Sequence, residues 1–304
     1  MQIFTKRLRV KNIAFIVNPI SGGKKKRTLP LLIRKFFSYA NGYNVTFYRT
    51  KCAGDAVVAA KRFADEGCHI VVATGGDGTV NEVARGLVGS STALGIVPLG
   101  SGNGFARHLG ISMNPRKALK YIASATPYRI DYGLINDIPF FCTAGVGFDA
   151  LVGDKFAKSG KRGFTSYLKQ ILREAFTYKP EQYSLTIDGK TIQREAFLVT
   201  FANASQWGYN ACIAPKASLS DGLLDVVVVS KFSLLRAPEV GVRLLARRID
   251  KLRFVETFKC QTAALKRAHE GCIHFDGEPW HLGREVNVKM VGGALTVLTN
   301  KKNV

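Results

Sequence analysis

The stretch Thr74-Gly75-Gly76-Asp77-Gly78-Thr79-Val80-Asn81-Glu82 decides how the first part of this chain folds. It directly follows an apolar run, 69–73, and directly precedes a helix-like run, 83–88. Its three glycines remove the Cβ atoms that would keep a phosphate away from backbone N–H groups, and a helix N-terminus presents free donors to an anion. The stretch therefore predicts a strand, a glycine turn and a helix that together bind a phosphorylated ligand.

Asp77 stands among these glycines, where its carboxylate would repel a phosphate unless a divalent cation or ordered water lies between them. The pattern consequently favours a magnesium nucleotide as the ligand. A plainer interpretation is a glycine-rich turn that only closes a βα unit, with Asp77 capping the helix. Glycine motifs do produce such false positives.

Two more segments repeat the order of strand, glycine turn and following segment. The predicted strand 93–97 runs into the glycine-rich loop 98–107, and the predicted strand 13–17 runs into Asn18-Pro19-Ile20-Ser21-Gly22-Gly23-Lys24. Loops that follow successive parallel strands meet at one edge of the sheet, at the crevice where such folds bind ligands. Three loops are therefore expected to line one site.

The chain divides near residue 130 into two regions with different sequence patterns. Up to that point strands at 13–17, 45–48, 70–73 and 93–97 alternate with helical runs such as 54–66, which predicts a parallel sheet. From residue 131 the runs are short and rich in β-branched and aromatic residues, which predicts an antiparallel β domain. Those runs are 138–144, 183–187, 196–202, 224–229, 273–275, 286–290 and 294–298, with turn signals at 188–189, 221–222 and 292–293.

The composition indicates a folded protein and gives no sign of a membrane span or a disulfide framework. The 304 residues are 46% hydrophobic, which suits one large or two moderate folded domains, and the six cysteines show no paired spacing. No apolar run approaches the roughly 20 residues of a membrane span, and the start lacks a secretory segment, so a cytoplasmic protein is expected. The five histidines show no metal-ligand spacing.

A net charge of +22 predicts attraction to polyanions. Nucleic acid is not the expected partner, because neither an interleaved basic-aromatic pattern nor zinc-finger spacing is present. An anionic membrane surface is the alternative, and two amphipathic segments, 165–178 and 233–258, are candidates for contact with it, although each also suits packing on a core. The basic cluster 24–27 adjoins the first glycine loop, where its charge favours phosphate.

Five motifs, in this order and at these separations, make the chain similar to the diacylglycerol kinase catalytic family. The resemblance covers nearly the whole chain and is nearest to the soluble bacterial lipid kinases related to sphingosine and ceramide kinases. The motifs are Asn18-Pro19 with Ser21-Gly22, Gly75-Gly76-Asp77-Gly78-Thr79, the loop 100–107, Ser220-Asp221-Gly222-Leu223-Leu224-Asp225, and Asp276-Gly277-Glu278-Pro279.

The resemblance implies a fold and a reaction. The fold is an N-terminal parallel α/β domain like that of NAD and diacylglycerol kinases, residues 1–130, followed by a C-terminal antiparallel β-sandwich domain, residues 131–290, with the tail 291–304 returning to the first domain. The reaction is ATP-dependent phosphorylation of a lipid hydroxyl at the inner face of the membrane, with Mg²⁺ as cofactor. The oligomeric state is left open, a dimer included.

Residue roles follow from the loops and from the resemblance. Glu278 is implied as the general base that takes the proton of the lipid hydroxyl, and Asp77 is the other catalytic candidate. A structural magnesium site is implied at Ser218, Asp221 and Leu223. The predicted nucleotide-binding residues are Asn18, Ser21, Gly22, Thr50, Gly75, Gly76, Asp77, Gly78, Thr79, Val80, Asn81 and Ser101.

One departure from the family pattern bears on function. Many bacterial diacylglycerol kinases carry an aspartate directly after the asparagine of the third loop, and this chain has Gly104 after Asn103. The acceptor is therefore left open between diacylglycerol and a sphingoid or ceramide-like lipid. Two alternatives also stay open: an NAD kinase-like enzyme with a soluble substrate, and a catalytically weak nucleotide- or lipid-binding protein.

Overall fold

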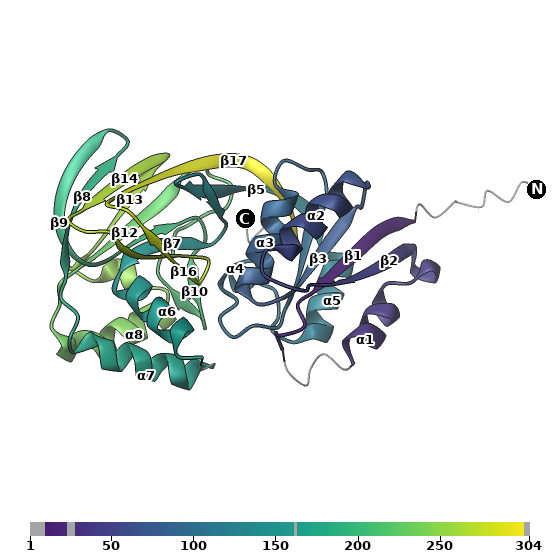
Figure 1. Ribbon diagram of the computed structural model, residues 1–304, viewed down its shortest axis with the longest axis horizontal. Coiled ribbons are helices and arrows are strands. Elements are labelled where there is room, and N and C mark those ends of the chain that lie inside the picture. Colours follow the sequence, from purple (N-terminus) through teal and green to yellow (C-terminus); the bar gives the residue numbers. More distant parts are fainter. Residues whose placement is uncertain (1–9, 23–27, 161–162, 301–304) are drawn as a thin grey trace, which may run out of the picture.

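Strands β1 (Lys11–Val17), β3 (Ile70–Gly75) and β4 (Ala93–Pro98) are apolar along most of their length because both faces of their sheet are covered. The computed structural model describes residues 10–22, 28–160 and 163–300. All neighbours are parallel in the order β4-β3-β1-β2, with β2 (Tyr43–Arg49) at the edge. The predicted parallel α/β domain is confirmed (Figure 1).

The two faces of this sheet carry different helices. Ala14 and Ile16 of β1 face α2 (Asp55–Asp65) and α3 (Asp77–Leu87), whereas Ile13 and Phe15 face α1 (Leu29–Phe36) and α5 (Pro115–Ser124). This alternation is the two-residue period of a strand. The short helix α4 (Gly104–His108) follows the loop after β4, and the 3₁₀ turn η2 (Tyr39–Asn41) precedes β2.

The second region is an antiparallel β structure, as predicted. Its strands bury alternate apolar residues in a core of their own. They are β5 (Thr126–Ile135), β6 (Ile138–Phe140), β7 (Thr143–Gly147), β8 (Glu181–Ile187), β9 (Lys190–Ala202), β12 (Leu224–Ser230), β13 (Val255–Cys260), β14 (Thr262–Arg267), β15 (Gly271–Phe275), β16 (Glu278–Leu282) and β17 (Glu285–Thr299), with the short pair β10 (Gln206–Gly208) and β11 (Ala211–Cys212).

Helices α6 (Phe148–Lys158), α7 (Phe164–Ala175) and α8 (Ala237–Leu245) lie on one side of this β region (Figure 1). They share an apolar cluster with β9 and β12. The 3₁₀ turns η3 (Leu234–Arg236) and η4 (Ile249–Lys251) flank α8. The candidate membrane segments therefore form the outer layer of the second region; the basic positions 24–27, 161 and 162 lie outside the described residues.

One predicted turn and one predicted strand were wrong. Gly292 and Gly293 do not separate two strands: β17 continues through them with a bulge, because the N–H of Gly293 (φ 54°) donates to the Asp131 carboxylate over 2.7 Å. The run 138–144 instead divides into β6 and β7, because the N–H groups of Phe141 and Cys142 donate to the Asp276 carboxylate.

Strand β17 connects the two regions. Residues 285–289 of β17 pair with β14, and Val297 pairs in parallel with Leu94 of β4. Strand β5 pairs with β17 on both sides of the bulge. Figure 1 shows β17 and β5 running together from one region to the other. One continuous sheet of hydrogen-bonded strands consequently runs through both regions.

Candidate active site

The three glycine loops and the end of β2 lie at the carboxyl edge of the parallel sheet. Backbone hydrogen bonds join these strand ends: the N–H of Asn18 donates to Thr74 over 3.0 Å, that of Thr50 to Val17 over 3.1 Å, and that of Leu99 to Gly75 over 2.7 Å. The predicted nucleotide-binding residues of the loops are thus brought to one edge, as topology requires of parallel strands.

Side chains tie the first loop to the second and third. The Asn18 amide donates to the Thr79 hydroxyl over 3.0 Å and accepts from the Ile20 N–H over 2.9 Å. Gly22 has a φ of 83°, and a Cβ there would lie 3.0 Å from Cβ of Leu99. Glycine at this position therefore permits both the left-handed backbone and the close packing of the loops.

Asp77 does not cap its own helix. Its carboxylate accepts hydrogen bonds from the N–H groups of Asn103 and Gly104, each over 2.8 Å, so that it caps the N-terminus of α4 and fixes the third loop to the second. Burial raises the pKa of Asp77 to about 6, against the lowering effect of these donors.

Glu278 reaches the same place from the second region. A Cβ built on Gly78, in the first turn of α3, would lie 2.5 Å from Oε1 of Glu278. A larger residue at position 78 would force this carboxylate to move. Glu278 is exposed as a residue, but nearby protein partly desolvates its carboxylate, and this desolvation, followed by the negative charges of Glu82 and Asp276, raises the pKa of Glu278 above its ordinary value.

The turn that carries Glu278 is held by Asp276, whose role the sequence did not reveal. The buried Asp276 carboxylate accepts from the N–H groups of Phe141 (2.9 Å), Cys142 (2.7 Å) and Thr143 (3.3 Å) and from the amide of Asn81 (2.8 Å). Asn81 is therefore committed to this carboxylate and to the carbonyl of Pro139. Its place in the Asp-Gly-Glu motif was the only sequence signal for Asp276.

The structure also places Thr50 and Ser101, which were predicted to bind the nucleotide, and their neighbour Glu82. Thr50 is buried at the end of β2, and Ser101 is exposed in the third loop. Glu82, the last residue of the glycine-rich stretch 74–82, accepts hydrogen bonds from the N–H groups of Gly54 (2.9 Å) and Ala56 (3.2 Å). It caps α2 from α3, a role that sequence reasoning missed because the partners are far apart in the chain.

The candidate metal residues lie in the segment before β12, where one lysine is shared by two carboxylates. Asp221 Oδ2 is 2.7 Å from the Lys259 ammonium, which is also 3.0 Å from Asp225 Oδ2. Asp221 Oδ1 accepts from the N–H of Leu223 over 3.1 Å. Magnesium at Ser218, Asp221 and Leu223 stays a prediction.

Gly104 is required by packing in this chain. A Cβ there would lie 2.8 Å from the backbone oxygen of Gln206 and 3.1 Å from the carbonyl carbon of Trp207. These are backbone atoms of β10 that cannot swing aside. An aspartate, as in the family pattern, has no room at this position, and Asp77 binds the third loop through two backbone N–H groups instead.

We expect Gly104→Ala to lower the free energy of unfolding by about 1–3 kcal/mol, because the added methyl group overpacks against backbone. The matched control is Gly241→Ala in α8, where nothing lies within 4 Å of the added Cβ. Urea denaturation followed by circular dichroism measures both. An unchanged midpoint for Gly104→Ala would contradict the packing argument.

Comparisons with known proteins match both regions of the chain. The diacylglycerol kinase catalytic domain matches residues 12–135, and the YegS C-terminal NAD kinase beta sandwich-like domain matches residues 142–299. The chain is 32% identical to the diacylglycerol kinase of Bacillus subtilis over 88% of this chain and 90% of that one. It is 33% identical over 78% of both chains to a protein of Chromohalobacter salexigens named "Probable lipid kinase YegS-like".

Solved structures extend the comparison. A Bacillus anthracis protein assigned to the diacylglycerol kinases superposes with a TM-score of 0.80 at 25% identity, covering 97% of this chain and 99% of that one. An NAD kinase from Archaeoglobus fulgidus in complex with ATP gives a TM-score of 0.52 at 11% identity, covering 96% and 95%, which is a likeness of fold alone.

Fold and site together define a two-domain kinase with an NAD kinase-like plan. Within that class, the chain belongs to the diacylglycerol kinase catalytic family and is a lipid kinase. None of the helices in the described residues is long and apolar enough to cross a membrane.

Proposed function

We propose that this protein transfers the γ-phosphate of ATP to a hydroxyl of diacylglycerol or of a sphingoid or ceramide-like lipid at the inner face of the membrane. The observation that supports this most directly is the position of Glu278. Its carboxylate, supplied by the second region, lies over Gly78 in the first turn of α3, where a helix N-terminus favours phosphate. We infer that Glu278 lies beside the phosphates of the nucleotide when it is bound at this helix N-terminus.

The chemistry requires a positioned nucleophile and little covalent work from the protein. Glu278 accepts the proton of the lipid hydroxyl, whose oxygen forms a bond to the γ-phosphorus while the bond from that phosphorus to the bridging oxygen breaks. ADP leaves with the bond electrons. Because the pKa of Glu278 is raised, its carboxylate is a stronger base than an ordinary glutamate.

Nucleotide binding is assigned to the loops at the sheet edge. We assign phosphate and sugar contacts to the hydroxyls of Ser21 and Ser101, to the buried Thr50 at the end of β2, and to loop N–H groups other than those already described as donating within the protein. Asp77 uses one hydrogen bond on each oxygen within the protein, which leaves lone pairs for water bound to a nucleotide Mg²⁺. Mg²⁺ at this place would neutralise phosphate charge, and the donor set fits it.

A radiolabelled γ-phosphate assay tests the proposal. Mixed micelles present diacylglycerol, sphingoid base, ceramide or monoacylglycerol, and a lipid-free sample contains NAD. Label in one lipid is the expected result and names the acceptor. Label only in NADP would overturn the lipid assignment, and nucleotide binding without transfer to any acceptor would favour a binding protein.

Contact with the membrane is assigned to the outer faces of α7 and α8. The apolar side chains of the amphipathic segment 165–178 divide into two groups in the structure. Tyr167, Ile171 and Ala175 pack on the apolar cluster of the second region, whereas Leu168, Leu172 and Phe176 are 41%, 53% and 77% exposed. From η3 and α8, Leu235, Val242 and Leu245 are exposed as well.

Basic side chains accompany these exposed apolar residues. Lys169 and Arg173 are exposed on α7, and Arg247 and Arg248 follow α8. Apolar side chains flanked by cations suit the interface of an anionic bilayer, where burial of each apolar group adds to electrostatic attraction. The overall charge of +22 acts in the same direction.

We expect Leu168→Gln with Leu172→Gln to weaken binding to vesicles of phosphatidylcholine and phosphatidylglycerol by about tenfold or more, because two partly exposed leucines lose their burial in lipid. Vesicle co-sedimentation at several salt concentrations measures it. Leu31→Gln is the control, since Leu31 is 72% exposed on α1 in the first region. Equal binding by all three proteins would contradict this assignment.

A further inference from the structure

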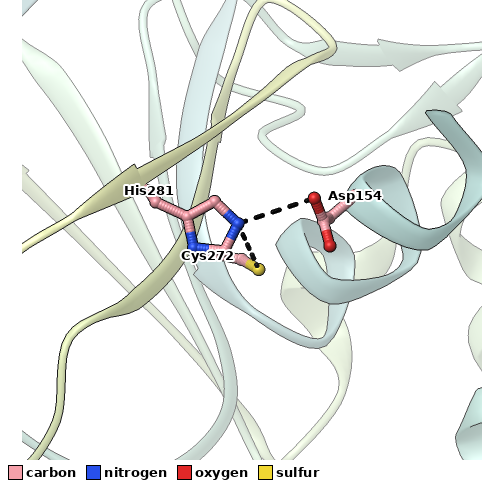
Figure 2. A group of neighbouring side chains, drawn as sticks. All are labelled: Asp154, Cys272 and His281. Atoms are coloured by element: carbon pink, nitrogen blue, oxygen red, sulfur yellow. Dashed lines mark hydrogen bonds and ion pairs between the residues drawn. The ribbon is translucent and has the colours of Figure 1, made fainter. Parts of the chain in front are cut away.

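Three potential metal ligands converge between helix α6 and the hairpin of β15 and β16, outside the proposed active site. Asp154 projects from α6, Cys272 from β15 and His281 from β16 (Figure 2). Cys272 and His281 are direct partners across the hairpin. A carboxylate oxygen of Asp154, Sγ of Cys272 and a ring nitrogen of His281 all lie within 4.8 Å of one another.

The separations match those of ligands around one tetrahedral ion. His281 Nε2 lies 3.6 Å from Cys272 Sγ and 3.6 Å from Asp154 Oδ1. Bonds of about 2.3 Å to sulfur and about 2.0–2.1 Å to nitrogen or oxygen place tetrahedral ligand atoms about 3.3–3.6 Å apart. Both measured separations are therefore compatible with a shared ion after small side-chain adjustments.

Lys158 orients the carboxylate for this role. Its ammonium is 2.7 Å from Asp154 Oδ2, one helical turn away, so Oδ1 is the oxygen that faces His281. Asp154 is 11% exposed at its side chain and His281 62%, so the group is open to solvent on the histidine side. That opening gives an ion a path of entry and leaves a fourth position for water.

We propose that Asp154, Cys272 and His281 form a binding site for Zn²⁺ or a similar borderline-soft divalent ion. Thiolate and imidazole ligands favour this class over Mg²⁺ and Ca²⁺, which prefer oxygen ligands. The neutral imidazole and the ionised carboxylate bind directly, and the Cys272 thiol releases its proton to the buffer as the metal–sulfur bond forms.

The bound ion would fasten the hairpin to α6. Glu278 is the first residue of β16, and His281 follows three residues later on the same strand, so the two side chains point to opposite faces. Helix α6 already packs on β15 and β16. A metal at this site therefore holds the strand that carries the base without competing for the base itself.

Titration of the full-length, chelator-treated protein with Co²⁺ tests the site without reference to activity. We expect one equivalent of Co²⁺ to give visible bands of tetrahedral intensity and a near-ultraviolet thiolate-to-cobalt band, and Zn²⁺ to abolish both. An excess of Mg²⁺ should leave them unchanged. Absence of a stoichiometric thiolate band, or its displacement by Mg²⁺, would overturn the proposal.

Single variants assign the ligands. Cys272→Ser is expected to remove the thiolate band, and His281→Ala and Asp154→Asn to weaken Zn²⁺ affinity by about tenfold or more. Cys52→Ser and His269→Ala are the controls, because both residues are exposed and lie outside the group. Circular dichroism verifies folding of each variant. Loss of the band in Cys52→Ser, or its survival in Cys272→Ser, would refute this assignment.

Discussion

Replacement of Glu278 by glutamine is expected to lower kcat for lipid phosphorylation about 10²–10⁴-fold, the usual contribution of a general base. Glutamine keeps the shape of the side chain over Gly78 but cannot accept the hydroxyl proton. Nucleotide affinity should change little, because the loops at the sheet edge are untouched. Steady-state transfer rates combined with ATP-analogue binding distinguish a lost base from a lost binding site.

The control for this variant is Glu285→Gln. Glu285 lies on β17, and its ion pair with Lys266 is exposed on both sides, so its loss should leave kcat within twofold or so. The pH profile adds a second readout. Because the pKa of Glu278 is raised, the carboxylate is protonated as pH falls at a higher value than for an ordinary glutamate, and kcat/KM should decline there. Wild-type activity in Glu278→Gln would refute the assigned base.

Replacement of Asp276 by alanine is expected to cost about 3–5 kcal/mol of folding stability. Three backbone N–H groups and the Asn81 amide would lose a buried, charged acceptor, and each unsatisfied donor costs about 1–3 kcal/mol. Urea denaturation measures the loss. Transfer activity should fall as well, because the turn that carries Glu278 loses its anchor.

Two further variants make the Asp276 result interpretable. Asp276→Asn keeps one acceptor oxygen, so its stability should fall between wild type and Asp276→Ala if the latter is too unstable to purify. Asp65→Ala, at an exposed position at the end of α2, should shift stability by no more than about 0.5 kcal/mol. An Asp276→Ala protein as stable as Asp65→Ala would show that the carboxylate network contributes nothing.

The sequence predicted the loops well because their placement depends on local signals and one topological rule. Each glycine run follows a buried strand, and parallel strands end at a common edge, so Asn18, Gly75 and Ser101 had to converge. The role of Asp77 was harder to predict. Its partners, the N–H groups of Asn103 and Gly104, belong to another loop, and nothing in the local pattern distinguishes this from a cap on its own helix.

Long-range contacts account for most of what sequence reasoning missed. Asn81 and Asp276 are 195 residues apart. The N–H groups of Phe141 and Cys142, which interrupt the predicted strand 138–144, also donate to the Asp276 carboxylate, more than 100 residues away in the chain. Glu278 was placed by family resemblance, not by its own surroundings. The group of Asp154, Cys272 and His281 has no sequence spacing to reveal it, because a helix and two strands supply one ligand each.

The position of β17 at the end of the chain has a consequence for the order in which this protein folds during synthesis. Leu94 of β4 is made about 200 residues before Val297, its partner on β17. At about 5–20 residues per second, the edge of β4 would wait roughly 10–40 s on the ribosome before that partner is available. An unpaired edge strand is prone to pair with other chains. The first region thus completes its sheet only after the second has been translated, which makes a ribosome-associated chaperone most useful in that interval.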